Sequence, residues 1–317
     1  MSFSIIGTGM YVPENTVTNN DISKLVDTND EWIKQRVGIS ERRISVNETA
    51  TDMAYQAALR ALENAHTSPE ELDLILGATV SGENICPSVA SLLQKKLGAS
   101  CPAYDINAAC SAFIFLLETA AGYFARGRVK KVLVVGAERL SGILDWSDRG
   151  TCIIFGDGAG AAVLSEGDGY IDSELTTVGG DDVIKIPSYN GDTPFYKGDN
   201  RPPYIMMQGQ ETFKYAVNAI THDIGTLLER NGLSKDDIKY IIPHQANSRI
   251  IDFASRKLKI PFEKFAVNID KYGNTSSASI PIALDEINRA GRLEKGDLII
   301  MTAFGGGLSN GACLIKW

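Results

Sequence analysis

The stretch DINAACSAFIFLLETAAGYFARG, residues 105–127, runs from a polar strand end through two alanines and a cysteine into a long apolar segment. Its central part, FIFLL at 113–117, is apolar on every face at helical spacing. A helix with no wet face has to lie between two other layers of the molecule. The stretch therefore predicts a central helix, buried between two sheets, that begins near Cys110.

Strand-like apolar segments alternate with helical patterns on both sides of this helix. In the first part of the chain they read SIIGTG, LDLILGATV, PAYDINA, KVLVVGAE and GAGAAVLSE; after about Tyr170 they read IKYIIPHQA, KFAVNID, DLIIMTAFGGG and NGACLIKW. Leu72 to Ile238 and Lys131 to Asp297 are each a step of 166 positions, and the third matched pair is displaced by only a few residues. This common offset indicates an internal duplication.

The duplication predicts an α/β fold built from two βαβ halves, 1–169 with the cysteine of the opening stretch and 170–317. Each half is expected to form a largely parallel sheet covered by helices. An ordinary doubly wound domain with a C-terminal appendage is the alternative, and the common offset disfavours it. The insertion at 179–203, which contains GG, DD, NGD and RPP, predicts an irregular loop region over a binding site.

The composition is that of a globular protein: 317 residues, 44% hydrophobic and 22% charged, with a formal net charge of −8. This charge argues against a general affinity for nucleic acid or anionic membranes. No apolar run reaches membrane-spanning length, and the N-terminus lacks the basic region of a secretory signal. The five cysteines form neither a CxxC pair nor a metal-ligand spacing, which suits a reducing cytoplasm.

Cys110 is the first candidate for chemistry, because the free N–H groups and the positive end of a helix favour a thiolate over a thiol. A small, buried, inert cysteine is the alternative. His244 follows the apolar strand YIIP at its C-terminal end, where α/β folds gather functional groups. His66 and His222 lie in or next to helical segments and are expected to be structural or solvent-facing.

The matching segment of the second half, FAVNIDKYGNTSS, places Asn274 close to the position that the internal symmetry assigns to Cys110. A helix cap is the alternative reading of this segment, and it suits the neighbouring serines better than Asn274. The AFGGG stretch at 303–307 ends the last long strand. Its glycines allow backbone N–H groups to face a developing oxyanion, or they form a flexible turn.

The chain resembles the β-ketoacyl-acyl carrier protein synthase III family of thiolase-fold condensing enzymes over its full length. The resemblance is carried in order by GTGMYVPENTVTN, DTNDEWIKQRVGISERR, DINAACSAF, DRGTCIIFGDGAGAAVL, PHQAN, NIDKYGNTSSASIP and AFGGG. It implies a thiolase-like fold with duplicated βαβ halves in a five-layer α-β-α-β-α arrangement. It also implies the initiating, decarboxylative Claisen condensation of type II fatty acid synthesis, which joins a primer acyl-CoA to malonyl-acyl carrier protein. The resemblance implies that coenzyme A takes part only as the substrate thioester and that no metal or redox cofactor is required. It also implies a homodimer in the cytoplasm.

Carried over to this chain, the family's catalytic set falls on Cys110, His244 and Asn274. Cys110 would hold the primer as an acyl-enzyme. His244 and Asn274 would hydrogen-bond the thioester oxygen of the malonyl group, so they are expected to serve condensation more than acyl transfer. The oxyanion of the attack would sit on the backbone N–H groups of Cys110 and Gly306.

The resemblance further implies a coenzyme A site. Trp32 would stack on the adenine, with Arg149 on its other face, and Arg36 would bind a phosphate. The entrance would be lined by Thr28, Gly209, Phe213 and Asn247. Without the resemblance, the tryptophan would be read as a core residue and the arginines as ordinary surface residues.

Acyl carrier proteins are acidic, so docking is expected on a local basic face despite the negative net charge. In the segment NSRIIDFASRKLK, Arg249 and Arg256 are seven residues apart and share one helix face. Lys257 and Lys214 are assigned to the same docking surface. A solvated face without a partner is the alternative.

Cys86, in ENICPSVA, stands where the family has a bulky aromatic residue before the proline of its gating loop. In the family this residue comes from the partner subunit and closes the far end of the acyl channel. A smaller side chain predicts a more open primer pocket. Acetyl, branched and longer primers all remain open at this point.

Two departures from the family pattern leave the fine shape of the pocket open: Ala112 replaces a glycine, and GGGLSNG with Leu308 and Asn310 replaces GGGFTWG. A biosynthetic thiolase would carry a second cysteine just before the glycine loop, where this chain reads MTAFGGG. Elongating ketosynthases use two histidines, and Asn274 occupies the second place here.

A paralogue acting on an unusual acyl group in secondary metabolism is the closest rival. A non-catalytic acyl-CoA or carrier-protein binding module is a rival of another class.

Overall fold

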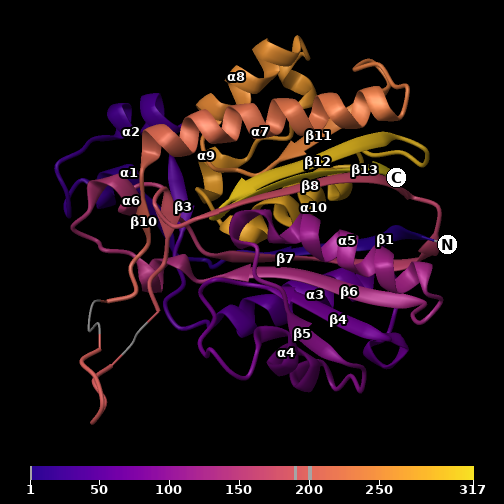
Figure 1. The fold of residues 1–317 in the computed structure, drawn as a ribbon, viewed down its shortest axis with the longest axis horizontal. Helices are drawn as coiled ribbons and strands as arrows, with labels where there is room; N and C mark the ends of the chain where they lie inside the picture. Colours follow the sequence, from indigo (N-terminus) through magenta and orange to yellow (C-terminus); the bar gives the residue numbers. More distant parts are fainter. Residues whose placement is uncertain (1, 189–190, 199–201) are drawn as a thin grey trace.

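The computed structural model describes residues 2–188, 191–198 and 202–317 of the chain. Two β-sheets lie one above the other, and helices lie above, between and below them (Figure 1). The lower sheet has the strand order β1 (Ser2–Tyr11), β7 (Gly158–Gly167), β6 (Lys131–Glu138), β4 (Leu74–Ala78) and β5 (Ala103–Asp105). The upper sheet has the order β11 (Ile238–Pro243), β12 (Leu298–Gly305), β13 (Gly307–Lys316) and β8 (Tyr170–Gly180).

The longer helices lie in the three helical layers (Figure 1). The middle pair is α5 (Ala112–Ala125) and α10 (Ser279–Arg289), the lower pair is α3 (Ala50–Asn64) and α4 (Val89–Leu97), and the upper pair is α7 (Gly209–Arg230) and α8 (Ser248–Leu258). Among the described residues, no helix is both long and apolar enough to cross a membrane. The expected five-layer α-β-α-β-α arrangement is confirmed.

The helix of the opening stretch, α5, is buried because both sheets pack against it. Phe113 and Leu116 are fully buried in one apolar cluster with Val134 of the lower sheet and Met301 of the upper sheet. Helix α5 therefore joins the two sheets through one apolar core. Truncating a buried phenylalanine such as Phe113 typically costs about 3–5 kcal/mol of folding free energy.

The two sheets repeat one topology. In both, two antiparallel pairings are followed by one parallel pairing: β1-β7-β6-β4 in the lower sheet corresponds to β8-β13-β12-β11 in the upper sheet. The expectation of largely parallel sheets is therefore wrong, because both sheets are mixed. The counterpart of β5 is reduced to a single parallel bridge between Ile241 and Phe265. The sheets change between β7 and β8, which supports the expected division at 169/170. That division itself stays a prediction.

The repeat is one residue longer than the sequence offset suggested. The matching strands β6 and β12 begin at Lys131 and Leu298. Before β6, the one-turn helix η2 (Ala109–Ser111) leads into α5, and before β12, the one-turn helix η5 (Ser276–Ala278) leads into α10. Both turns begin with a non-glycine residue in the left-handed region, Ala109 with φ 47° and Ser276 with φ 48°. This superposition pairs Cys110 with Ser277, so Asn274 lies three positions earlier than the counterpart of Cys110.

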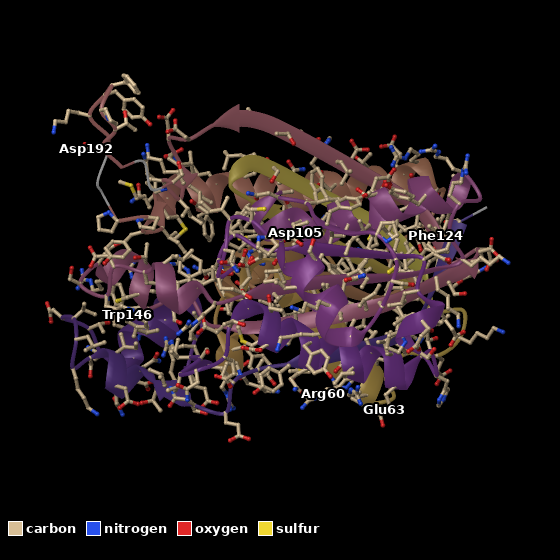
Figure 2. All side chains as sticks on the ribbon, turned by 90° about the horizontal axis from the view of Figure 1, so that it is seen from below. Arg60, Glu63, Asp105, Phe124, Trp146 and Asp192 are labelled. Carbon is tan, nitrogen blue, oxygen red and sulfur yellow. The ribbon has the colours of Figure 1, made fainter. Side chains whose placement is uncertain are left out.

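Most of the remaining elements gather at the left of Figure 1, at one end of the sheets. They are β2 (Thr16–Thr18), α1 (Asn19–Ile22), α2 (Asp30–Val37), β3 (Glu41–Arg43), η3 (Leu140–Ile143), α6 (Arg149–Cys152) and α9 (Ile269–Tyr272). Figure 2 places the side chain of Trp146, between η3 and α6, at this same end of the molecule. The short helices η1 (Pro69–Glu71) and η4 (Phe262–Lys264) lie at the other end, where Lys131 of β6 contacts Glu71 and Lys264 donates to the carbonyl of Ile238 in β11.

The insertion at 179–203 contains more regular structure than expected. β8 continues to Gly180, and β9 (Ile184–Lys185) pairs with β10 (Met206–Met207) just beyond the insertion. Positions 189–190 and 199–201 of the insertion lie outside the described residues. Ile184 and Ile186 line the cavity, so this region does border a site.

Candidate active site

A cavity of about 530 Å³ lies at the end of the two sheets and holds the three side chains that sequence analysis selected for chemistry. Cys110, His244 and Asn274 all line it, although they come from three separate segments. The lining also includes most of the expected coenzyme A and oxyanion residues: Trp32, Arg36, Arg149, Gly209, Phe213, Asn247 and Gly306. Thr28 and Cys86 are not among the residues that line it.

Cys110 lies in the turn η2, directly before α5 begins at Ala112. The expectation that the helix N-terminus favours a thiolate here is wrong. Burial, with a smaller effect from the charge of Glu138, raises the pKa of the Cys110 thiol to about 12, although a hydrogen bond with Ser276 acts to lower it. Desolvation outweighs the helix end because the low-dielectric surroundings penalise the charged sulfur. The resting enzyme therefore holds a thiol.

His244 follows β11 and is 2% exposed. Its Nδ1 lies 2.7 Å from the hydroxyl oxygen of Ser279, the first residue of α10. The centres of the His244 and Phe304 rings are 5.4 Å apart, in an edge-to-face arrangement. Burial lowers the pKa of His244 to about 3, so the imidazole is neutral near neutral pH. With Nδ1 held by Ser279, the other ring nitrogen remains for chemistry in the cavity. Sequence analysis missed Ser279, which is 35 residues away along the chain.

Asn274 is held in place from both its backbone and its side chain. Its N–H donates to the carbonyl of Ile154, and its own carbonyl accepts from the N–H of Gly156. Its side-chain oxygen accepts the N–H of Ser276 at 2.7 Å, two residues on, just before η5. The N-cap residue of η5 is Thr275, which makes no side-chain cap bond, so Asn274 is not a helix cap, and the two N–H groups of its amide remain for a ligand.

The glycine loop brings a second backbone segment against Cys110. A Cβ atom on Gly305 would lie 2.7 Å from the Cys110 nitrogen and 3.1 Å from the Ser111 nitrogen, so any side chain there would cover the N–H of Cys110. Gly306 is less crowded, because a Cβ there would approach nothing closer than Ile184 at 3.5 Å. Sequence analysis selected Gly306 and missed Gly305, for which the run of three glycines was the signal.

Trp32, on α2, lies next to two arginines at the cavity mouth. The guanidinium of Arg149 lies 4.9 Å from the centre of the tryptophan ring, and that of Arg36 lies 5.6 Å from it. Arg149 also donates to the carbonyl of Asp27 at 2.9 Å. Thr28, expected at the entrance, lies in the loop before α2 and does not line the cavity; its buried hydroxyl has no hydrogen-bond partner among the described residues.

Asn247 links the mouth of the cavity to α8. Its side-chain oxygen accepts the N–H of Arg249 and caps the helix, while its amide donates to the carbonyl of Arg36 at 3.2 Å. Gly209 is the first residue of α7, and Phe213 follows one turn later on the same helix. The entrance is therefore framed by the N-terminal ends of α7 and α8.

The expected docking residues are exposed and lie on or beside α8. Arg249 covers the ring of Phe213, with 5.9 Å from the guanidinium carbon to the ring centre, which places its charge next to the cavity mouth. The other three have polar partners: Arg256 pairs with Asp252 at 2.6 Å, Lys214 pairs with Glu211 at 2.8 Å, and Lys257 donates to Asn218 at 3.2 Å. Arg249 is thus the docking candidate closest to the site.

The positions that depart from the family pattern lie outside the cavity lining. Ala112 is buried at the start of α5. Asn310 faces α7, where its amide donates to Asp223 at 2.7 Å and its oxygen accepts from Tyr215 at 2.6 Å. Cys86 is exposed, next to an Ile85 side chain that is 96% exposed.

Comparison with known proteins gives one consistent family. The family model described as "3-Oxoacyl-[acyl-carrier-protein (ACP)] synthase III C terminal" matches residues 228–317, and the model "3-Oxoacyl-[acyl-carrier-protein (ACP)] synthase III" matches 104–179. A β-ketoacyl-[acyl-carrier-protein] synthase III from Clostridium acetobutylicum is 50% identical over 323 residues, covering 100% of this chain and 99% of its own.

Solved structures agree with this family. The crystal structure of 3-oxoacyl-[acyl-carrier-protein] synthase III from Aquifex aeolicus superposes with a TM-score of 0.93 at 46% identity, covering 99% of this chain and 100% of its own. The priming β-ketosynthase from the R1128 polyketide biosynthetic pathway gives 0.91 at 34% identity, covering 99% of this chain and 96% of its own.

Two sheets of matching topology with a shared buried helical layer define this chain as a thiolase-fold protein, and its cavity is that of a condensing enzyme. Relatives of this class that match the whole chain at close to half identity narrow the assignment. The chain belongs to the β-ketoacyl-[acyl-carrier-protein] synthase III family.

Proposed function

We propose that this chain catalyses the initiating condensation of type II fatty acid synthesis, between a primer acyl-CoA and malonyl-acyl carrier protein. The observation that carries the proposal is one apolar cavity that holds a cysteine, a neutral histidine and an asparagine with a free amide. These groups suffice for acyl transfer and for enolate stabilisation. The reaction proposed here uses the coenzyme A thioester as a substrate and calls for no cofactor.

In the first step the sulfur of Cys110 attacks the carbonyl carbon of the primer thioester. Because the pKa of this thiol is raised to about 12, its proton must leave as the carbon–sulfur bond forms. That proton passes to the departing sulfur of coenzyme A as the carbon–sulfur bond of the thioester breaks. The products are an acyl-cysteine and free coenzyme A. Burial lowers the pKa of His244 to about 3, so its imidazole is a poor proton acceptor and serves as a hydrogen-bond donor in the second step.

In the second step the malonyl thioester enters the same cavity. His244 and Asn274 donate hydrogen bonds to its carbonyl oxygen, which accumulates negative charge as CO2 leaves. The resulting enolate carbon attacks the acyl group on Cys110. The new oxyanion is held by the N–H groups of Cys110 and Gly306 until the carbon–sulfur bond breaks. The Cys110 thiolate then takes up a proton from the solvent, and the β-ketoacyl-carrier protein leaves.

The substrates are proposed to enter between α7 and α8. Trp32 and Arg149 are placed to hold the adenine, and Arg36 is placed to hold a phosphate. Since Arg149 lies directly over the Trp32 ring, adenine binding requires Arg149 to move or the base to stack on another face. The acidic carrier protein is proposed to dock on the exposed basic side chains around Arg249.

A cytoplasmic homodimer is the proposed form of the enzyme. The apolar and almost fully exposed Ile85 beside Cys86 supports this, since a single exposed side chain of this size at a loop tip suits burial by a second copy. Cys86 of one subunit is proposed to limit the primer channel of the other. All five cysteines are free, which suits a reducing compartment.

The second candidate is a paralogue that condenses or transfers an unusual acyl group in secondary metabolism. The similarity to a priming β-ketosynthase and the small residue at Cys86 favour keeping this candidate. The two candidates share the first chemical step and differ in the primer and in the acceptor.

The test incubates the protein with acetyl-, branched and longer acyl-CoAs and measures its intact mass. The expected result is one acyl group on Cys110, none on Cys110→Ser, and an unchanged yield for the control Cys101→Ser. Adding malonyl-acyl carrier protein should then release a β-ketoacyl-carrier protein. Acylation of Cys110→Ser as readily as wild type would remove the mechanism, and transfer to a different acceptor would favour the second candidate.

A further inference from the structure

The hydroxyl group of Ser279 is the polar neighbour of the His244 ring on the side away from the cavity. Ser279 is the first residue of α10, is 2% exposed and does not line the cavity. Its hydroxyl oxygen lies 2.7 Å from Nδ1 of His244 and accepts the backbone N–H of Gln245 in a longer bond of 3.4 Å. Within the described ranges of the chain, the hydroxyl group has these two hydrogen-bond partners and no other.

The direction of the bond between Ser279 and His244 follows from the donors and acceptors that are present. A hydroxyl group has one hydrogen and two lone pairs, and a backbone N–H can only donate. The N–H of Gln245 therefore occupies one lone pair of the Ser279 oxygen. If Nδ1 of His244 donated as well, the hydroxyl hydrogen would be buried without an acceptor among the described residues, which costs free energy. Ser279 therefore donates, and Nδ1 accepts.

A neutral imidazole whose Nδ1 accepts carries its proton on Nε2. Two features of the site keep the ring neutral. Burial lowers the pKa of His244 to about 3. In addition, Nδ1 lies at the N-terminal end of α10, where the partial positive charge of the helix disfavours an imidazolium.

The orientation of the His244 ring is fixed by its other neighbours. The backbone N–H of His244 donates to the carbonyl of Thr302 in β12 at 2.8 Å, so the main chain is tied to the next strand. The ring of Phe304 packs edge-to-face against the imidazole, with 5.4 Å between the ring centres. Turning the ring over would exchange its two nitrogens and break the bond to Ser279. Nε2 is therefore the nitrogen that remains for a ligand in the cavity.

The same segment of the chain fixes Asn274 in a matching way. The side-chain oxygen of Asn274, which is its acceptor, takes the backbone N–H of Ser276 at 2.7 Å. Ser276 begins η5, and Ser279 follows directly after η5. This short segment therefore occupies the acceptor atom of both side chains. The groups left for the cavity are the N–H of one ring and the two N–H groups of one amide.

We propose that Ser279 is a positioning residue that holds the neutral imidazole of His244 with its proton on Nε2, so that His244 and Asn274 offer hydrogen-bond donors to the cavity. The inference rests on the proposed function in taking the malonyl thioester oxygen as the group that receives these donors. That oxygen becomes negative as CO2 leaves, and donors already aimed at it stabilise the charge. A ring with its proton on Nδ1 would turn a lone pair toward the same charge. Ser279 contacts no reacting atom and acts through His244.

The test locates the ring protons of His244 in the full chain at pH 7, without substrate. Proton–nitrogen correlation spectra of protein with isotope-labelled histidine distinguish a protonated ring nitrogen from an unprotonated one. The chain has three histidines, and the signals of His244 are those that disappear in His244→Ala. The wild type should show the proton on Nε2. In Ser279→Ala, where water can donate or accept, the ratio of the Nε2–H form to the Nδ1–H form should fall about fivefold, the factor for one neutral hydrogen bond.

Ser277→Ala is the matched control. It removes a buried hydroxyl from the same turn, but this hydroxyl bonds Glu138 and the carbonyl of Ala78 and has no contact with His244, so the ratio should stay unchanged. Activity gives a second measurement. In Ser279→Ala, kcat for decarboxylation of malonyl-carrier protein should fall about tenfold, because the ring stays in place but its donor is no longer fixed. KM and priming by acyl-CoA should be nearly unchanged.

A wild-type spectrum with the proton on Nδ1 would overturn the proposal. An unchanged ratio in a folded Ser279→Ala protein would do the same, as would an equal fall in Ser277→Ala. If Ser279→Ala does not fold, Ser279→Cys decides: a thiol is a weaker donor, so the ratio should fall part of the way, and an unchanged ratio counts against the proposal. The spectra need no substrate, so a wild type that condenses nothing would refute the proposed function and still leave the ring proton located.

Discussion

Replacing Gly305 by alanine should disable the oxyanion hole while leaving every catalytic side chain in place. The added Cβ would lie 2.7 Å from the backbone nitrogen of Cys110, closer than real Cβ contacts come. Either the turn η2 shifts or the N–H is covered by a methyl group. Losing one oxyanion donor costs about 10²–10³ in rate, or about 3–4 kcal/mol of transition-state stabilisation. We expect a loss of this size for Gly305→Ala.

The matched control is the neighbouring residue. A Cβ on Gly306 would meet Ile184 at 3.5 Å and Ala109 at 3.6 Å, which are ordinary contacts, and the backbone N–H of residue 306 is retained. Neither glycine is in the left-handed region, so backbone strain does not separate the two variants. Gly306→Ala should therefore lose less than about 1 kcal/mol.

The assay follows the rate of acyl-enzyme formation by rapid quench and mass spectrometry, and then the yield of β-ketoacyl-carrier protein. Thermal melting reports whether both variants fold, and alkylation of Cys110 reports whether the thiol is still accessible. A folded Gly305→Ala protein that primes within about threefold of wild type would refute the assignment of the Cys110 N–H to the oxyanion hole. Equal losses in the two variants would show that the crowding at Gly305 is not the cause.

Four other changes test separate parts of the molecule. His244→Ala and Asn274→Ala should each slow decarboxylation of malonyl-carrier protein by about 10²-fold and leave priming nearly intact, since both side chains are proposed to stabilise the enolate oxygen; intact decarboxylation in both variants would remove that role. Arg249→Glu should weaken carrier-protein binding in a salt-sensitive way with priming by acyl-CoA retained, and parallel loss of both would indicate misfolding instead. Cys86→Phe should narrow the range of primer chain lengths, and an unchanged profile would mean that Cys86 does not gate the channel; each methylene accommodated contributes about 0.8 kcal/mol. Burial raises the pKa of Asp223 from 3.8 to about 6, so the folded protein binds this proton more tightly than the unfolded chain. The contribution of this proton to stability is complete below pH 4 and is lost as the pH rises through 6. Asp223→Asn should flatten this part of the stability profile in urea unfolding and raise the free energy of unfolding at pH 8 by about 1–3 kcal/mol.

Features set by local pattern were predictable from the sequence. The apolar run at 113–117 predicts a buried helix, and in the structure four of its five residues are buried between two sheets. The strand ends at His244 and at the glycine loop gather at one cavity because the ends of neighbouring strands share one edge of a sheet. These inferences depend on periodicity and strand order, which the sequence contains.

Features set by long-range packing were not predictable in the same way. The N-terminal position of Cys110 on a helix suggested a thiolate, but burial and a carboxylate at the end of another strand decide the opposite. Ser279, which holds the His244 ring, has no signature that distinguishes it from neighbouring serines. The two turns before α5 and α10 have Ala109 and Ser276 in the left-handed region, where glycine is the usual residue. Without a glycine to mark either turn, the sequence comparison did not align the two turns.

The chemistry of the site lies where the two halves of the fold stop matching. β6 ends in Glu138 and β12 ends in Gly305, at equivalent positions of the repeat. In one half the carboxylate receives the hydroxyl of Ser277, and in the other the absence of a side chain at Gly305 leaves the N–H of Cys110 uncovered. The same turn therefore serves once as an anchor for a buried anion and once as a nucleophile with an open oxyanion site. A carboxylate at the end of both strands would place a negative charge where the reaction generates an oxyanion, so this asymmetry follows from the charge that develops during catalysis.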